Sequence, residues 1–260
     1  CNAVINSPAG YQLLENYADL FDGEHYMNEE SILEISFMGG DWDVSNWGVQ
    51  LFVAPEDGWQ KYCIPSKDLV AAYDSENDKE RENANIVFWD NPDWADENWD
   101  PCMDPEIKVP FNYKEKHPDG WNSGDHPVLL RLADIILLKA EAQNETGDLS
   151  GALASLNLIR KRAGLPNQTA SGKEELRAKI LKERRLELAF EGHRFDDLVR
   201  LGIFVQTMNG LNEYKYTCGD GVQSAGTKIN YNANSDKILC PIPQRERDTN
   251  PNLTQNPGYN

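Results

Sequence analysis

The sequence predicts a predominantly α-helical fold of tetratricopeptide-like helix pairs, with long irregular loops and minor β content. Three observations lead to this fold class. Residues 128–208 carry a sustained helical hydrophobic pattern, residues 1–127 hold all seven tryptophans among polar loop residues, and residues 209–260 are rich in Asn, Gly and Pro. We therefore expect a loop- and Trp-rich, ligand-facing part (1–127), a helical scaffold (128–208) and an irregular C-terminal segment (209–260) that packs on the scaffold.

Three consecutive segments of the scaffold place apolar residues at helical spacing, which predicts one buried face for each. The second segment ends at Gly164, with Pro166 just beyond it. The third segment begins with the spacing of a capping box, formed by Ser171 and Glu174. The first two segments should form an antiparallel hairpin against which the third helix packs. The stripes are Leu129, Leu132, Ala133, Ile136, Leu137 and Ala140; Leu149, Ala152, Leu153, Leu156 and Ile159; and Leu176 with Ile180.

Three glutamates continue the buried stripe of the third segment in steps of three and four residues. Because ionised side chains are buried only when they are paired, we expect arginines to neutralise them. Arg160 and Arg162 of the hairpin are further candidates for this role. The predicted structural ion network comprises Arg131, Glu183, Arg184, Glu187, Glu191, Arg194 and Arg200. The alternative, a metal or catalytic site with His193, Asp196 and Asp197, is less favoured because the interspersed arginines repel a cation.

The loop-rich part combines a short expected helix at Tyr17–Phe21, an expected strand within residues 30–37 and the tryptophan-rich loops. Most of the tryptophans are flanked by Asp, Asn, Gly or Pro, and loops of this kind run over surfaces and often carry function. An indole packs against the C–H face of a sugar ring while Asp and Asn bind its hydroxyls. For any single tryptophan, anchoring of a loop on the body is the competing interpretation. The candidate ligand-binding residues are Asp41, Trp42, Asn46, Trp47, Trp59 and Tyr62.

The net charge of −18 is concentrated in the first half of the chain, where residues 1–126 hold 27 acidic and 7 basic side chains. Such a surface repels phosphate backbones, so nucleic-acid binding is disfavoured. Asp96, Asn98 and Asp100 imitate the start of an EF-hand loop, but Pro101 stands where that loop needs glycine. We expect no cofactor, and Ca²⁺ held by loop carboxylates remains an open alternative. Five cysteines without a C-x-x-C pair disfavour structural zinc and leave disulfide partners open.

We expect no enzymatic activity, because G-x-S-x-G, phosphate-loop and H-E-x-x-H motifs are absent from the sequence. A glycoside hydrolase remains an alternative, since it needs only two suitably spaced carboxylates and an acidic chain always offers such pairs. A helical-repeat scaffold that binds protein partners is the other alternative.

The scaffold and the C-terminus also carry a series of ordered sequence blocks. They are Arg131-Leu-Ala-Asp134, Asn157-Leu-Ile-Arg160, Glu183-Arg-Arg-Leu-Glu187, Arg194-Phe-Asp-Asp-Leu198, Asn250-Pro-Asn-Leu253 and Gln255-Asn-Pro-Gly-Tyr259. Together these blocks resemble the SusD/RagB family of outer-membrane nutrient-binding lipoproteins. Asp78-Lys-Glu-Arg81 departs from the family pattern by one extra residue, which makes the alignment of the neighbouring loops doubtful.

The resemblance implies the C-terminal portion of one SusD-like domain, with the N-terminal part and its lipid anchor lying outside this chain, so that Cys1 is not the lipidated residue. It implies non-catalytic binding of a glycan or oligosaccharide at the cell surface, with the full-length protein lipid-anchored in the outer membrane. The implied partner is a SusC-like TonB-dependent transporter to which the glycan is delivered. All of this is expectation at the level of the sequence.

Overall fold

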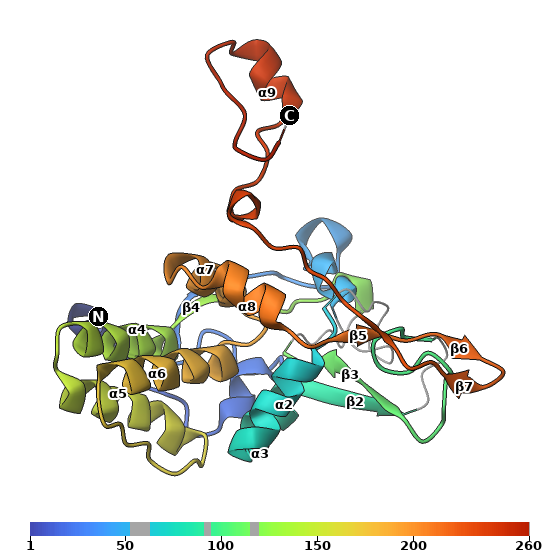
Figure 1. Cartoon of the computed structure of the whole chain (residues 1–260). Coiled ribbons are helices and arrows are strands. Elements are labelled where there is room, and N and C mark those ends of the chain that lie inside the picture. Colours follow the sequence, from blue (N-terminus) through green and yellow to red (C-terminus); the bar gives the residue numbers. More distant parts are fainter. Residues whose placement is uncertain (53–62, 91–94, 115–119, 260) are drawn as a thin grey trace.

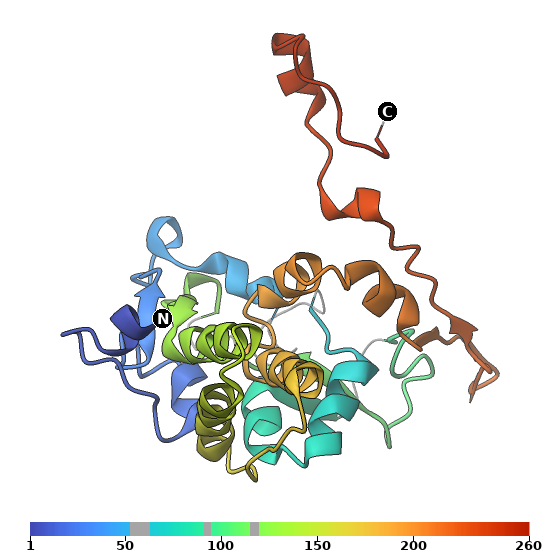
Figure 2. The ribbon, with the colours of Figure 1, turned by 60° about the vertical axis from the view of Figure 1, so that its left-hand side comes forward.

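The computed structural model describes residues 1–52, 63–90, 95–114 and 120–259. Its centre is a set of three helices, α4 (Leu132–Glu145), α5 (Leu149–Arg162) and α6 (Lys173–Glu187), that lie side by side in both views (Figures 1 and 2). α4 and α5 form the predicted antiparallel hairpin, which ends at Gly164 in the left-handed conformation (φ +66°). The main core is made by the predicted stripes of these helices: Leu132, Ala133, Ile136, Leu137, Ala140, Ala152, Leu156, Ile159, Leu176 and Ile180. The predicted fold class is therefore confirmed.

Two local predictions about these helices are wrong. Leu129 belongs to a strand, β4 (Val128–Arg131), and is 45% exposed, because β4 pairs with β1 (Ser31–Glu34) before the helix begins. The capping box at Ser171 does not form either, since α6 starts one residue after Gly172. Glu175 takes the part expected of Glu174: its carboxylate accepts hydrogen bonds from the Ser171 backbone N–H (2.8 Å) and hydroxyl (2.6 Å).

Two antiparallel strand pairs attach the N-terminal half to the scaffold. β1 pairs with β4 so that Ser31 lies opposite Arg131, and the Leu132 N–H donates to the Glu30 carbonyl at 2.9 Å. β2 (Ile86–Asp90) pairs with β3 (Lys108–Asn112), which buries Val109 and Phe111. These pairings place Glu30 and Arg131, which are distant in sequence, next to each other.

The remaining elements of the first half are short. They are α1 (Asn2–Ile5), η1 (Tyr17–Phe21), η2 (Trp42–Val44), η3 (Trp47–Leu51), α2 (Lys67–Glu76), α3 (Lys79–Asn85) and η4 (Gly120–Asn122). The helix and strand expected at 17–21 and 30–37 are both present, with the strand shortened to four residues. α2 and α3 lie between the central helices and the strand pair β2–β3 (Figure 1), with α2 in contact with α6 and α3 in contact with β2.

The C-terminal part begins with α7 (His193–Arg200) and α8 (Phe204–Gly210), followed by four two-residue strands. The strands are β5 (Tyr214–Lys215), β6 (Cys218–Gly219), β7 (Val222–Gln223) and β8 (Thr227–Lys228), which fits the expectation of a loop-like or weakly formed sheet. A disulfide joins Cys102 to Cys218 and ties this hairpin region to the first half of the chain.

Residues 235–259 contain η5 (Ser235–Ile238) and α9 (Gln244–Thr249) and project away from the helices (Figure 1). The hydrogen bonds of this arm are internal: Gln255 bonds both the N–H and the carbonyl of Ile242, and the Tyr259 hydroxyl donates to the Leu239 carbonyl. This arrangement differs from the expected packing of the C-terminal segment on the scaffold. Leu239 and Leu253 are exposed on this arm, at 54% and 37%.

Candidate functional site

Three tryptophans from separate short helices form a cluster on the surface, which we call the tryptophan platform (Trp42, Trp47 and Trp121). The ring centroids of Trp42 and Trp47 are 5.8 Å apart with the planes at 13°, and Trp121 lies 6.1 Å from Trp42 at 38°. All three are well exposed, at 54%, 46% and 44%. Met38 and Val44, joined by a backbone hydrogen bond, are also exposed. An exposed apolar group of this kind is characteristic of a binding surface.

Hydrogen bonds and one tight glycine contact hold the two loops of the platform together. The Gly40 N–H donates to the Asn122 carbonyl (2.9 Å) and the Asn46 N–H donates to the Ser123 carbonyl (2.8 Å). Gly39 has φ +67°, and a Cβ there would lie 3.0 Å from the Gly124 nitrogen, so only glycine allows the loops to approach this closely. The platform is therefore fixed by backbone contacts, although it contains little regular structure.

The predicted ligand-binding residues differ in their exposure and in their hydrogen-bond partners. Trp42 and Trp47 are brought together, and Asp41 is exposed beside them while its carboxylate accepts a hydrogen bond from the Asp43 N–H. Asn46 uses its side-chain amide to bond the Asp125 carbonyl at 3.2 Å, which holds the loops together. Trp59 and Tyr62 lie outside the described residues. None of these positions tests whether a ligand binds.

Trp121 was not among the predicted ligand-binding residues, although the sequence held a signal for it. It sits in Gly120-Trp-Asn122, the same Gly- and Asn-flanked setting as Trp42 and Trp47. In contrast, Trp89 and Trp99 are half-buried against Val109 and Phe111. Trp89 belongs to strand β2, and the loop-anchoring interpretation fits Trp99.

Glu183, Glu187 and Glu191, which we call the glutamate row, have buried side chains that pair with cationic side chains. Glu187 is fully buried, and its carboxylate meets Arg131 (2.6 Å), Arg81 (3.0 Å) and Arg162. Arg131 also bonds Glu30 at 2.8 Å and Glu191 at 2.6 Å. Glu187 therefore joins cations delivered by α3, β4 and α5 at a single point.

The network extends to both sides of Glu187. Arg81 pairs with Glu183 (2.8 Å) and Asp78 (2.5 Å), while Lys114 pairs with Glu191 (2.5 Å). Among the described residues, the connected ion pairs comprise six carboxylates and six cations: Glu30, Glu76, Asp78, Glu183, Glu187 and Glu191 with Arg81, Lys114, Arg131, Arg160, Arg162 and Lys182. The charges balance, which is the condition for burying so many ionised groups.

Two of the predicted members belong to a separate cluster around Asp197. Arg184 pairs with Asp134 (2.7 Å) and Asp197 (3.1 Å), and Arg200 pairs with Asp197 (2.7 Å) and with Glu141. This cluster ties α7 to α4 and α6.

The placement of Arg194 in the ion network is wrong. Within the part of the chain that the structure describes, Arg194 makes no ion pair and lines a hollow with Leu198 and Tyr231. The helical row stops earlier than the sequence pattern suggests, because α6 ends at Glu187 and the chain turns at Phe190 (φ +67°) and Gly192 (φ +82°). Glu191 reaches the network through this turn, whereas Arg194 is carried away from it.

The network predicts how stability depends on pH. Burial alone would raise the pKa of Glu187, but Arg162, Arg131 and Arg81 outweigh it and hold that pKa well below the ordinary 4.5. The pKa of Glu191 is lowered in the same way, with Arg131 and Lys114 outweighing burial. As the pH falls below about 4.5, the unfolded chain takes up protons that the folded chain excludes, so the folded state loses stability. We expect calorimetry between pH 7 and about pH 3 to show a falling Tm, more steeply in the wild type than in Glu187→Gln. Parallel pH profiles for the two proteins would contradict this assignment.

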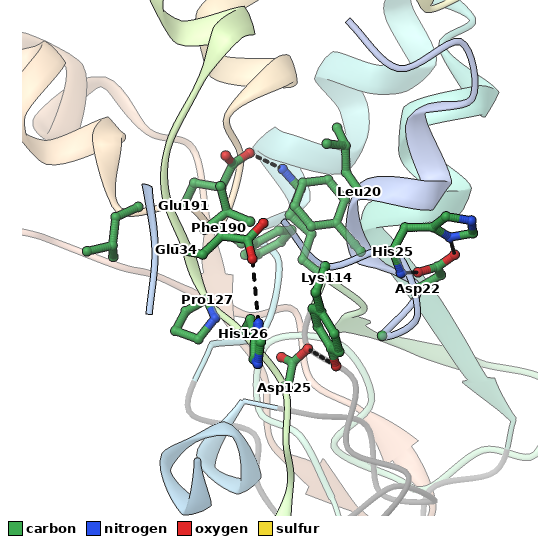
Figure 3. A pocket seen from close by; sticks show the side chains of 15 residues that line it. Leu20, Asp22, His25, Glu34, Lys114, Asp125, His126, Pro127, Phe190 and Glu191 are labelled. Atoms are coloured by element: carbon green, nitrogen blue, oxygen red, sulfur yellow. Dashed lines mark hydrogen bonds and ion pairs between the residues drawn. The ribbon is translucent and has the colours of Figure 1, made fainter. Parts of the chain in front are cut away.

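A pocket of about 210 Å³ lies between this network and the platform loop (Figure 3). Lys114 and Glu191 of the network line it together with Asp125 and His126 of the loop. His126 stacks on Tyr26 (4.1 Å between centroids) and lies 3.5 Å from the Glu34 carboxylate. Burial lowers the pKa of Lys114 to about 8, although Glu191 opposes this effect. The pocket therefore links the buried ion network to the base of the platform.

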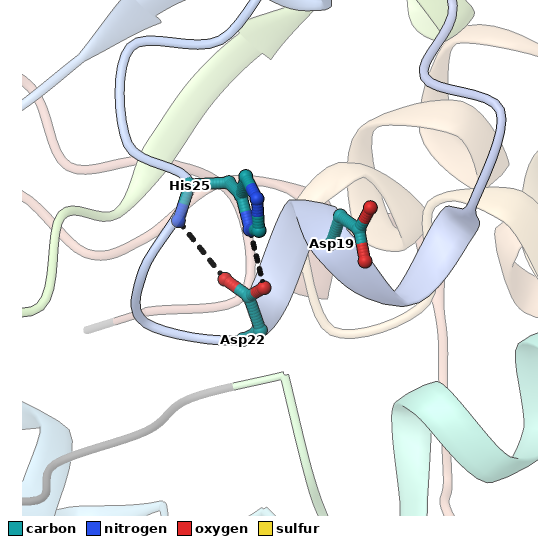
Figure 4. Close-up of side chains that lie close together, drawn as sticks. All are labelled: Asp19, Asp22 and His25. Carbon is teal, nitrogen blue, oxygen red and sulfur yellow. Dashed lines mark hydrogen bonds and ion pairs between the residues drawn. The ribbon is translucent and has the colours of Figure 1, made fainter.

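A metal site receives limited geometric support. Among the described residues, Asp19, Asp22 and His25 bring ligand atoms within 4.8 Å of one another, but the His25 ring is engaged with Asp22 at 2.6 Å (Figure 4). In the acidic loop, Asp96 accepts the N–H groups of Asn98 and Trp99, and Asp100 accepts those of Cys102 and Asp104. These two carboxylates therefore cap local turns, and Ca²⁺ binding by this loop stays an untested alternative to the expected absence of a cofactor.

The amino-acid sequence of this chain is similar to those of known proteins. SusD-like protein P25 of Formosa agariphila is 26% identical over 306 residues, covering 100% of this chain and 54% of that protein. The starch-binding protein SusD of Bacteroides thetaiotaomicron is 33% identical over 132 residues, covering 50% of this chain and 21% of that protein. The chain thus spans about half the length of P25, and less of SusD.

A solved structure of a laminarin-binding SusD-like protein superposes with a TM-score of 0.68 at 25% identity, covering 99% of this chain and 57% of that chain. Among the residues that the structure describes, none of the helices combines the length and apolar character needed to cross a membrane. The sequence model of the SusD family matches residues 107–259, more than half of the chain. On this match and on the shared fold, the chain belongs to the SusD family.

Proposed function

We propose that this chain binds a glycan or oligosaccharide, without catalysis, on the tryptophan platform. The observation that carries the proposal is the exposed cluster of Trp42, Trp47 and Trp121, with two indole planes nearly parallel. Pyranose rings present C–H faces that pack on indoles, and Asp41 is exposed at the edge of the cluster, where it can accept hydrogen bonds from sugar hydroxyls. The starch-binding and laminarin-binding proteins that this chain resembles support the same ligand class.

The charge distribution favours a neutral glycan over an anionic one. Asp41, Asp43 and Asp125 lie within the platform segments, and the described residues 35–52 and 120–125 contain no lysine or arginine. Sulfated or uronic glycans would therefore meet like charge. Because each sugar hydroxyl exchanges a water hydrogen bond for a protein one, we expect modest affinity.

The cellular setting is part of the proposal. We propose that the full-length protein is lipid-anchored at the surface of the outer membrane and passes its glycan to a SusC-like TonB-dependent transporter. Family membership supports this setting, and co-purification of such a transporter with the full-length protein would test it.

Isothermal titration calorimetry against a panel of neutral α- and β-linked oligosaccharides, paired with anionic counterparts, tests the proposed activity. We expect at least one neutral ligand to bind and to be recovered intact after long incubation. Recovery of shortened products would instead indicate a glycoside hydrolase. A folded protein that binds none of the panel would contradict the proposal and favour a scaffold for protein partners.

A further inference from the structure

A second hollow is lined by Tyr214 and Lys215 of β5. In Figure 1 the strands β5, β6 and β7 lie on the side of the molecule away from α4. The hollow has a volume of about 350 Å³ and is walled by the start of α2, the loop at residues 97–99 and the strand region at 213–231. A larger adjoining hollow of about 750 Å³ shares Ile64, Glu97 and Asn98 with it. None of its lining residues belongs to the tryptophan platform.

The walls of this hollow are held in place by covalent and polar links. The Cys102–Cys218 disulfide joins the two sides with a Cα–Cα distance of 5.0 Å. Glu97 is bound twice, since its carbonyl accepts from the Tyr216 N–H (2.6 Å) and its carboxylate pairs with Lys215 (2.5 Å). The walls of the hollow are therefore ordered before a ligand binds, which reduces the conformational entropy lost on binding.

Two hydrogen-bond acceptors in the wall have no partner among the described residues. Asn98 Oδ1 and Glu213 Oε1 are both buried and unpaired, although the other Glu213 oxygen accepts from the Tyr231 hydroxyl at 2.6 Å. Buried acceptors without donors are rare in folded proteins because leaving them unpaired is unfavourable. A small rotation of either side chain toward a donor in the hollow would restore the missing hydrogen bond.

The same hollow contains an ammonium group without a carboxylate partner. Within the described part of the chain Lys67 forms no ion pair, and its Nζ lies 4.6 Å from the Tyr216 ring centroid and 5.3 Å from that of Trp99. Burial lowers the pKa of Lys67, while Asp96 and Glu213 act in the opposite direction. The hollow thus offers N–H donors, unpaired acceptors and the aromatic rings of Trp99, Tyr214 and Tyr231.

We propose that this hollow is a second carbohydrate-binding site, which takes a neutral sugar ring. A sugar hydroxyl both donates and accepts, so neighbouring hydroxyls can satisfy Asn98, Glu213 and Lys67 together while the C–H face packs on an aromatic ring. A metal cation is disfavoured by the ammonium of Lys67 within the hollow. The lining carries two carboxylates, Glu97 and Glu213, and two ammonium groups, Lys67 and Lys215, so its charges balance and give no net attraction for a strongly anionic ligand.

The test uses the chain with its platform disabled by Trp42→Ala and Trp47→Ala. The probes are neutral oligosaccharides of α- and β-linked glucose and one sulfated counterpart, and the readout is the indole N–H resonance of Trp99. We expect the neutral probes to shift this resonance in the wild type and in the platform variant alike. In the wild type, a shift of the Trp99 resonance without shifts of the Trp42, Trp47 and Trp121 resonances would overturn the proposed platform and leave the second site standing.

Two further substitutions test the polar groups of the hollow. Asn98→Ala should weaken binding about threefold to tenfold and Lys67→Met about tenfold or more, since the lysine bond is charge-assisted. Asn83→Ala, at an exposed asparagine on α3, is the matched control and should leave binding unchanged. The Asn98 side chain makes no hydrogen bond among the described residues, so we expect its variant to fold normally. A Trp99 resonance unmoved by every neutral probe, or a stronger response to the sulfated probe, would overturn the second site.

Discussion

Replacing Glu187 by glutamine is expected to lower the free energy of unfolding by about 3–5 kcal/mol and the Tm by roughly 10 °C. The carboxylate of Glu187 is completely buried and meets three guanidinium groups, from Arg81, Arg131 and Arg162. Glutamine keeps the shape but removes the negative charge, so the network retains an excess of buried positive charge. Thermal unfolding followed by circular dichroism measures the effect.

Glu145→Gln is the matched control for this prediction. Glu145 also pairs with two cations, Arg177 and Lys173, but its side chain is 39% exposed. Ion pairs between exposed side chains contribute little to stability, so this variant should unfold close to the wild type. We also expect folded Glu187→Gln protein to keep its glycan affinity. An unchanged Tm combined with loss of binding would show that Glu187 belongs to a ligand site instead of the scaffold.

The double substitution Trp42→Ala, Trp47→Ala is expected to weaken glycan binding by at least about 2 kcal/mol, or roughly thirtyfold, without lowering the Tm appreciably. Both indoles are about half exposed, so their removal leaves little cavity in the core. Titration calorimetry with the best ligand of the panel, alongside a thermal scan, measures both quantities. Trp121→Ala should show a similar loss, because Trp121 lies against Trp42.

Phe88→Ala provides a control for the removal of an exposed aromatic ring. Phe88 is 36% exposed on β2 and does not contact the platform among the aromatic pairs of the described residues. Its variant should bind like the wild type. Equal affinity in the wild type and the double tryptophan variant would remove the platform from the account.

The helical scaffold could be predicted from the sequence because its periodicity is local. The apolar stripes of α4, α5 and α6 repeat every three or four residues, and a burial requirement follows directly from that spacing. The need for cations around Glu183 and Glu187 followed as well, from the energetics of burying charge. Arg131 was correctly assigned to this group.

Arg160 and Arg162 were also candidates from the sequence, and both pair with the glutamate row. Arg81 and Lys114 could not be predicted as partners, because they meet it only in three dimensions. Arg81 is 106 residues from Glu187, and Glu30 reaches Arg131 through the pairing of β1 with β4. Arg194 is near the glutamates in sequence, which made it a candidate partner, but the turn that contains Phe190 in the left-handed conformation carries it away from them. Bulky residues rarely adopt a positive φ angle, so the residue type at position 190 does not predict a turn there.

The sequence predicted that tryptophans lie on the surface, but not which of them form the platform. Polar, glycine-rich surroundings identified Trp42 and Trp47 as surface residues, whereas the contact with Trp121 depends on the close approach of Gly39 and Gly124. Exposure alone did not reveal which of the similarly flanked tryptophans come together. Which tryptophans cluster depends on tertiary contacts between loops, and no periodic sequence pattern predicts such contacts.

The most direct measurement is a titration of the best neutral glycan followed by the indole N–H resonances of all the tryptophans. The resonances of Trp42, Trp47 and Trp121 should shift together with one affinity, and the half-buried Trp89 should stay unchanged. Binding that moves Trp89 or other core signals while these three remain still would show that the exposed indoles are not where the carbohydrate binds.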